Sequence, residues 1–174
     1  FLFENDGAGY FTNITAGSGL EVTGFFLQAK MEDFDNDGYV DLVYSGGAHA
    51  FFHNNGDNTF TEVPGTFPGN DIMHSFAFGD VNRDGAVDLY ASYGNGYVSS
   101  DSNNEDILWV NAGNANNWIT FELDGIQSNQ DAVGAKVVIT GAFGTQIREV
   151  RAGESYGITC TASCHFGLGA NEIV

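Results

Sequence analysis

The sequence is poor in basic residues, in proline and in long apolar runs. Only 5 of the 174 residues are Lys or Arg against 23 Asp or Glu, so the formal net charge is −18. Such a charge argues against nucleic acid and anionic membrane surfaces as partners. No apolar run reaches the roughly eighteen residues of a membrane-spanning helix, so we predict no membrane insertion. Two prolines beside 24 glycines are typical of a turn-rich all-β chain.

The most distinctive feature that is present is an acidic loop that occurs twice, at Asp33–Leu42 and at Asp80–Leu89. Each copy has oxygen-bearing side chains at positions 1, 3, 5 and 9 and a glycine at position 6, a spacing that wraps a short loop around a hard cation. Without a cation the clustered carboxylates would repel one another. Two copies with the same apolar exit favour two calcium sites over a pair of solvated turns. The predicted ligands are the side chains of Asp33, Asp35, Asp37, Asp41, Asp80, Asn82, Asp84 and Asp88 and the backbone carbonyls of Tyr39 and Ala86.

Both loops are expected to lead into β-strands rather than helices. An EF-hand loop requires a bidentate acid at position 12, where this chain has Tyr44 and Ala91. The residues that follow each loop are rich in β-branched and aromatic side chains, which favour strands. We therefore predict that the two loops connect strands of a sheet.

A second motif repeats almost in step with the acidic loops. The segment Phe3–Thr12 recurs as Phe52–Thr61, 49 residues later, and a looser copy begins at Leu108. Its Phe-x-Asn-x-Gly pattern predicts a hairpin. A period of about forty to fifty residues, built from short strands and Gly/Asn/Asp turns, is typical of propeller blades. The predicted fold class is all-β, with partial β-propeller blades followed by a small β-sandwich or barrel-like domain.

These motifs carry two family resemblances. The acidic loop with Val-Asp-Leu, alternating with the Asn-Gly hairpin, resembles the calcium-binding FG-GAP (VCBS-type) repeats of integrin-α-like propellers over residues 1–114. Four ordered motifs beyond residue 115 resemble the ASPIC/UnbV domain of the cartilage acidic protein family. They are Asn117–Leu123, Ser128–Val137, Arg148–Gly157 and His165–Gly169. The resemblance implies incomplete blades over 1–114 and a C-terminally truncated ASPIC/UnbV-like β domain over 115–174.

The resemblance and the calcium loops together imply a place and a role. About two and a half repeats are present where a closed propeller needs at least four blades, so we expect a fragment of a longer exported protein. Calcium is abundant outside cells, which points to an extracellular or cell-surface location. We expect an adhesion or surface-assembly module whose partner is a protein or a glycan, or a second copy that pairs with an open blade edge.

Cys160 and Cys164 leave three alternatives open. In an exported protein two nearby cysteines predict a disulfide. Free thiols are the second alternative. A haem or metal site is the third, because Cys160-x-x-x-Cys164-His165 is one residue longer than a haem-c attachment motif. The haem alternative would make the chain an electron-transfer component.

No catalytic residue is predicted. His49, His53 and His74 are scattered, and lone histidines in strands are more often packed or hydrogen-bonded than catalytic. No Ser or Cys has an evident base partner, and the conspicuous aspartates are assigned to calcium. We expect Trp109 and Trp118 to fill the cores of the blades and of the sandwich. The alternative is a carbohydrate-binding domain or an accessory domain of a carbohydrate-active enzyme, in which an exposed aromatic side chain would stack on a sugar.

Overall fold

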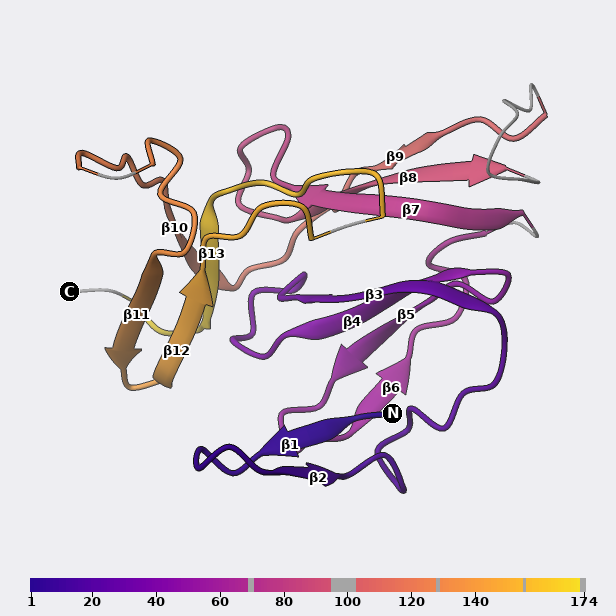
Figure 1. Cartoon of the computed structure of the whole chain (residues 1–174), viewed down its shortest axis with the longest axis horizontal. Coiled ribbons are helices and arrows are strands. Elements are labelled where there is room, and N and C mark those ends of the chain that lie inside the picture. The colour runs from indigo at the N-terminus through magenta and orange to yellow at the C-terminus, as the bar shows by residue number, and fades with distance from the viewer. Residues whose placement is uncertain (69–70, 95–102, 128, 155, 173–174) are drawn as a thin grey trace.

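The computed structural model describes residues 1–68, 71–94, 103–127, 129–154 and 156–172. In these ranges every regular element is a strand, and none of the sheets closes into a barrel (Figure 1). The predicted all-β class is therefore confirmed. Because these ranges contain no helix, none is long and apolar enough to cross a membrane. The strands are β1 (Phe3–Asn5), β2 (Phe11–Asn13), β3 (Phe26–Glu32), β4 (Asp41–Gly46), β5 (Ala50–Asn54), β6 (Phe60–Glu62), β7 (Ile72–Gly79), β8 (Asp88–Gly94), β9 (Ile107–Trp109), β10 (Asn117–Phe121), β11 (Lys136–Gly141), β12 (Gly144–Glu149) and β13 (Cys164–Gly169).

Strands β3 to β9 form one seven-stranded antiparallel sheet in the order β6-β5-β4-β7-β8-β9, with β3 beside β4, and we divide it into two neighbouring blades. The first contains β3, β4, β5 and β6, and the second contains β7, β8 and β9. A single residue pair, Gly46 with Met73, joins β4 to β7. The acidic loops connect β3 to β4 and β7 to β8, and each loop leaves and re-enters its sheet at a paired position. The prediction that the loops join strands is confirmed.

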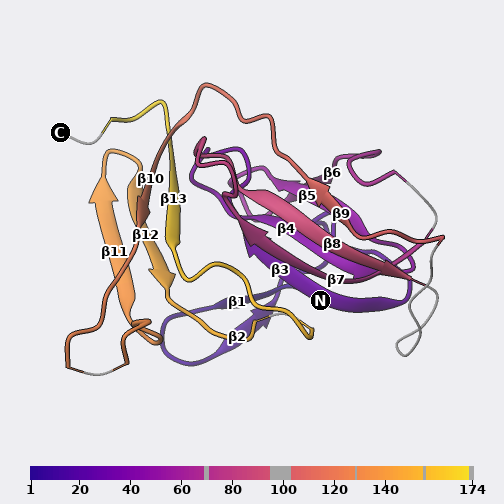
Figure 2. The same cartoon turned by 90° about the horizontal axis from the view of Figure 1, so that it is seen from above.

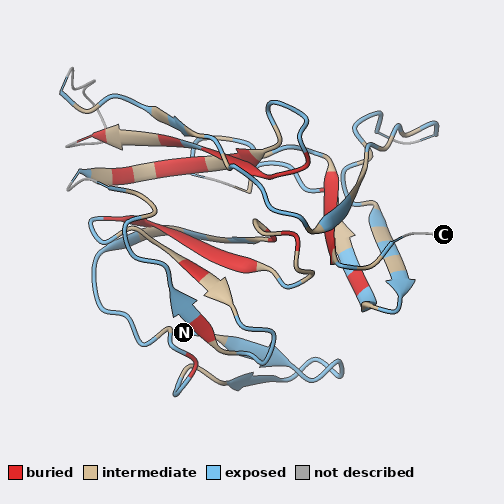
Figure 3. Ribbon diagram, turned by 180° about the vertical axis from the view of Figure 1, so that it is seen from behind, coloured by how far each residue is buried: buried red, intermediate tan, exposed pale blue. Residues whose placement is uncertain are grey.

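Strand β4 is buried on both faces because it separates two cores. Successive side chains of a strand point to opposite faces. Val43 accordingly packs between the two blades with Met73 and Phe76. Leu42 and Tyr44 point the other way, into a smaller core that Leu2 of the N-terminal segment also contacts. The hairpin of β1 and β2 itself is exposed at every strand position (Figure 3).

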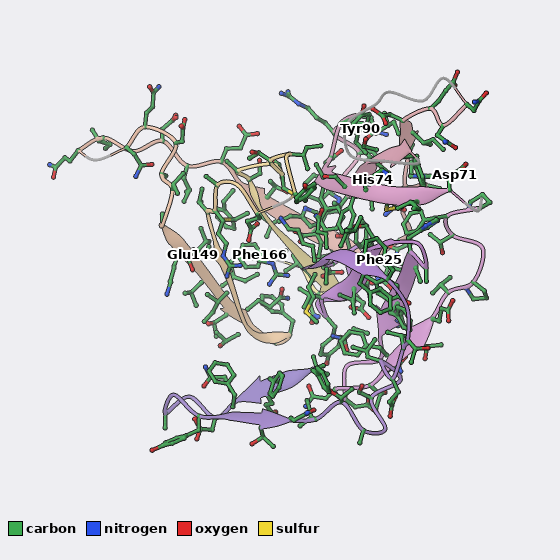
Figure 4. The ribbon with its side chains drawn as sticks, turned by 45° about the vertical axis from the view of Figure 1, so that its right-hand side comes forward. Phe25, Asp71, His74, Tyr90, Glu149 and Phe166 are labelled. Carbon is green, nitrogen blue, oxygen red and sulfur yellow. The ribbon has the colours of Figure 1, made fainter. Side chains whose placement is uncertain are left out.

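The C-terminal region has its own core. β10 pairs with β13 and β11 pairs with β12. Cys164 and Phe166 of β13 pack with Val150 at the centre of this core, and Phe166 is labelled in Figure 4. In two perpendicular views β13 lies on the side of this region that faces the blades (Figures 1 and 2). Ser128 and Ser155 of the predicted motifs lie outside the described residues.

Candidate metal centres

The two acidic loops follow the same backbone course. Position 4 has a positive φ in both, 60° at Asn36 and 62° at Arg83. Position 6 does so as well, with 98° at Gly38 and 86° at Gly85. Glycine adopts this left-handed conformation without the steric cost that a Cβ would bring. The two left-handed residues reverse the chain within each loop, as the glycine spacing predicted.

The hydrogen bonds within the two loops also match position for position. In each, the position-1 carboxylate accepts the glycine N–H, the position-5 carboxylate accepts the N–H of position 7, and the position-9 carboxylate accepts the N–H of position 2. In the first loop these are Gly38 N to Asp33 Oδ2 (2.9 Å), Tyr39 N to Asp37 Oδ1 (2.8 Å) and Phe34 N to Asp41 Oδ2 (3.2 Å). In the second they are Gly85 N to Asp80 Oδ2 (2.9 Å), Ala86 N to Asp84 Oδ1 (2.9 Å) and Val81 N to Asp88 Oδ2 (2.9 Å). The carboxylates are thus held by backbone donors.

The asparagine of the hairpin motif joins each hairpin to its loop. The Asn54 N–H donates to Asp41 Oδ1 at 2.9 Å, and its Nδ2 donates to the Val40 carbonyl at 2.9 Å. Asn111 makes the same two bonds in the second blade, to Asp88 Oδ1 at 2.8 Å and to the Val87 carbonyl at 3.3 Å. The two repeated sequence motifs therefore form one structural unit in each blade, which explains why they recur almost in step.

The first loop gathers its carboxylates in a buried place. Oxygens of Asp33, Asp35 and Asp37 lie within 4.8 Å of one another. Asp33 is fully buried, and its Oδ1 has no hydrogen-bond partner among the described residues. Burial, and then the neighbouring carboxylates, raise the pKa of Asp33 to about 7. A buried oxygen without a partner is costly unless a proton or a cation satisfies it.

The fourth carboxylate of this loop has a partner that the sequence did not reveal. Asp41 is fully buried, and burial raises its pKa to about 6. His53 Nδ1 lies 3.2 Å from Asp41 Oδ1 and 3.4 Å from Asp35 Oδ2. His53 precedes the hairpin asparagine, and that adjacency was the available signal. The corresponding residue of the second blade is Val110.

The second loop is more open and less acidic. Asn82 replaces an aspartate at position 3, and both Asn82 and Asp84 are exposed, whereas Asp88 is buried. Asp84 N donates to Asn82 Oδ1 at 3.1 Å, while Asn82 Nδ2 donates to Asp84 Oδ2 at 2.8 Å. Both loops present the oxygen donors that suit a hard cation. The structure brings Asp33, Asp35 and Asp37 together in the first loop. Among the described residues, Asp80, Asp84 and Asp88 of the second loop do not form such a group. The ligand assignment itself remains a prediction.

The structure shows no bond between Cys160 and Cys164, so the disulfide stays a prediction. Cys160 packs against the core between the blades, and its Sγ accepts the Phe78 N–H at 3.4 Å. Cys164 is buried in the C-terminal core. The two cysteines thus pack against different cores.

The haem alternative gains no support either. His165 is buried, and its Nε2 lies 2.6 Å from Asn36 Oδ1. Its Nδ1 lies 3.0 Å from the Thr120 hydroxyl. Burial lowers the pKa of His165 to about 4, so the ring is neutral at pH 7. Both ring nitrogens bind protein groups, which leaves neither of them for iron.

Comparison with known protein families agrees with both resemblances. Residues 33–91 match the FG-GAP-like repeat, and residues 125–174 match the ASPIC and UnbV family. Among curated proteins, none shows significant similarity to the chain. The first match covers both acidic loops, and the second covers β11, β12 and β13.

Proposed function

The chain joins an FG-GAP-like repeat to an ASPIC/UnbV domain, and we propose that it is a non-catalytic, extracellular calcium-binding module for adhesion or surface assembly. FG-GAP repeats are typical of extracellular or surface proteins, and both domains are generally non-catalytic. The calcium proposal rests mainly on the environment of Asp33. Its fully buried carboxylate has one oxygen without a partner among the described residues, and it lies beside Asp35 and Asp37.

The carboxylates of the first loop repel one another, and a calcium ion between them would remove that repulsion. Side chains of Asp33, Asp35, Asp37 and Asp41 would hold the ion together with the Tyr39 carbonyl. Calcium would supply the positive charge that these carboxylates otherwise lack. Calcium takes about six to eight oxygen ligands in a flexible geometry, so one loop supplies most of a complete shell.

A structural role for calcium suits a binding surface. Both loops lie at strand ends and connect the paired strands of a blade. A loop that is rigid before its partner arrives loses less entropy on binding. The partner is a protein or a glycan, or a second copy that adds to the edge strands β6 or β9. The charge of −18 disfavours polyanionic partners.

Thermal unfolding with and without a chelator tests the calcium proposal. A ligand that binds only the folded state stabilises it by about 2.7 kcal/mol at a hundredfold excess over its Kd. We expect chelation to lower the melting temperature, and Asp37→Ala and Asp84→Ala each to remove part of that response. Asp124→Ala, an exposed acid outside both loops, is the matched control. Equal melting temperatures with calcium and with chelator would refute the calcium role.

The adhesion role requires a separate measurement. Sedimentation velocity in calcium and in chelator reports self-association, and an array of immobilised glycans under the same two conditions reports sugar binding. We expect calcium-dependent association in one of the two assays. Retention by the array that is equal in calcium and in chelator would instead favour the carbohydrate-binding alternative.

A further inference from the structure

The first acidic loop packs directly against β13 of the C-terminal domain. Asn36, at loop position 4, is buried, and its carbonyl accepts the Gly169 N–H at 2.8 Å. The Asn36 Oδ1 accepts a hydrogen bond from His165 Nε2 at 2.6 Å, while the Thr120 hydroxyl binds the other ring nitrogen. Asn36 is therefore hydrogen-bonded to residues near both ends of β13, His165 and Gly169.

The backbone of β13 approaches the proposed metal ligand itself. A Cβ on Gly167 would lie 2.2 Å from Asp33 Oδ2 and 2.4 Å from Asn36 Cα, so this strand position has room only for glycine. Gln146 of β12 supports the contact, because its Nε2 donates to the Gly167 carbonyl at 2.7 Å and lies beside Gly38. A small displacement of the loop must therefore reach β13.

Asn36 also connects the two loops. Its Nδ2 donates to the Gly85 carbonyl in the second loop at 2.9 Å. The Trp118 ring covers Gly85 so closely that a Cβ there would lie 1.8 Å from ring atoms. Trp118 in turn stacks on His165, with the ring centroids 5.9 Å apart. The Asn36 side chain, which lies between Asp35 and Asp37 in the sequence, thus contacts both the second loop and the C-terminal domain.

We propose that the cation in the first loop controls how tightly β13 is held against the blades, an inference that rests on the proposed calcium binding. Asn36 lies between Asp35 and Asp37, at positions 3 and 5. A cation that pins both carboxylates fixes the left-handed residue between them and aims its side chain at His165. Without the cation the like charges repel, and the bonds from Asn36 to β13 weaken.

The second loop meets the C-terminal domain at Gly85, under Trp118, and not through a hydrogen bond of its position-4 side chain in the described part of the chain. Its position-4 residue, Arg83, has the same left-handed backbone but an exposed side chain. A different set of contacts holds the segment Tyr156–Thr161 to β7. The Ser75 hydroxyl donates to the Tyr156 carbonyl at 2.6 Å, and the Thr161 N–H donates to the Phe78 carbonyl at 3.1 Å. Because these contacts involve neither loop, the C-terminal domain remains attached while β13 loosens.

Amide hydrogen exchange of the whole chain, with and without calcium, tests the inference. We expect calcium to slow exchange in β13 by about tenfold or more and to change Tyr156–Thr161 by less than about twofold. Asn36→Gly preserves the left-handed backbone and deletes both side-chain hydrogen bonds. It should bind calcium within about threefold of the wild type in calorimetry, yet lose most of the calcium effect on β13. Arg83→Gly, the matched substitution in the second loop, should retain that effect.

Fluorescence supplies a second readout in a Trp109→Phe background, where Trp118 is the only tryptophan. Because the Trp118 ring also covers Gly85 of the second loop, the measurement uses an Asp84→Ala background. The calcium-dependent change of Trp118 emission that remains there should disappear when Asp37→Ala or Asn36→Gly is added. Calcium binding without any change in β13 exchange would overturn the inference and leave the calcium proposal intact. An Asn36→Gly variant that responds like the wild type would also overturn it. If calorimetry detects no heat of calcium binding to the wild type, the proposed function itself is overturned.

Discussion

The two acidic loops share a backbone and a hydrogen-bond pattern but not an environment. In the first, Asp33 and Asp41 are fully buried and Asn36 is covered by β13. In the second, position 4 and its neighbours on either side are exposed. The motif therefore determines the geometry of each loop, whereas the domain packed against the loop determines its electrostatics. A buried acid is costly to ionise, and an exposed one is not.

The largest expected difference concerns pH in the calcium-free protein. Burial raises the pKa of Asp33 from its usual 3.8 to about 7, so the folded state retains this proton as pH rises from about 4 to about 7. Stability should fall across that window, by on the order of 4 kcal/mol if this carboxyl acts alone. Denaturant unfolding in chelator measures the slope. Asp33→Asn should flatten it and Asp124→Asn should not; an equal slope in both would contradict the assignment.

Saturating calcium should abolish most of this pH dependence above about pH 7, because the ion binds the ionised form. Apparent calcium affinity should correspondingly fall as pH drops below about 7. Calorimetric titrations at two pH values check this consequence. An affinity that does not change between pH 7.5 and pH 5.5 would show that no buried acid titrates on binding.

The next largest effect compares two glycines, one beside each loop. Gly167→Ala places a Cβ against Asp33 Oδ2 and the Asn36 backbone, and should destabilise the fold by about 3 kcal/mol, the upper range for overpacking. At Gly79, directly before the second loop, a Cβ meets only Thr161 at 3.6 Å, an ordinary contact. Gly79→Ala should therefore change the free energy of unfolding by less than about 1 kcal/mol. Similar losses in the two variants would mean that β13 packs against the first loop no more tightly than Thr161 packs against Gly79.

Loss of the hairpin asparagine should lower the free energy of unfolding by a smaller amount, nearly equal in the two blades. Asn54→Ala and Asn111→Ala each remove side-chain hydrogen bonds that join a hairpin to its loop, at a cost of about 1–2 kcal/mol. Asn111 also donates to the Phe34 carbonyl at 2.8 Å, so its loss should be slightly greater. Urea unfolding of both variants makes the measurement. A loss confined to one variant would show that the blades are not equivalent units.

The smallest effect belongs to His53, the residue that distinguishes the first site from the second. His53→Val reproduces Val110 of the other blade. Because calcium prefers oxygen ligands, we expect calcium affinity at pH 7.5 to change by less than about threefold. Calorimetry of this variant makes the comparison. A loss of tenfold or more would identify the imidazole as a direct contributor to the site.

Much of the local structure could be predicted from the sequence. Loop position 6 needed a glycine, the apolar exits needed strands, and the repeat period indicated blades. These features depend on short-range sterics and on alternation along one strand, which a sequence displays directly. The pairing of each hairpin asparagine with its loop was implicit in the near-constant offset of the two motifs.

The environment of each site could not be predicted, because it depends on segments far apart in the chain. Nothing near Asp33 indicates that Gly167 will cover it, and nothing near Cys160 indicates that its thiol packs between the blades while Cys164 faces another core. The predicted disulfide is not seen in the structure and stays a prediction. Sequence proximity brings two cysteines near each other, but strand alternation and core membership decide where each points.

Calcium titration calorimetry of the wild type, Asp37→Ala and Asp84→Ala counts the ions that each loop binds. We expect two calcium ions per wild-type chain and one in each variant, and the ion that remains in Asp84→Ala should be the one that protects β13. No calcium heat in the wild type, or an unchanged stoichiometry in both variants, would contradict this expectation.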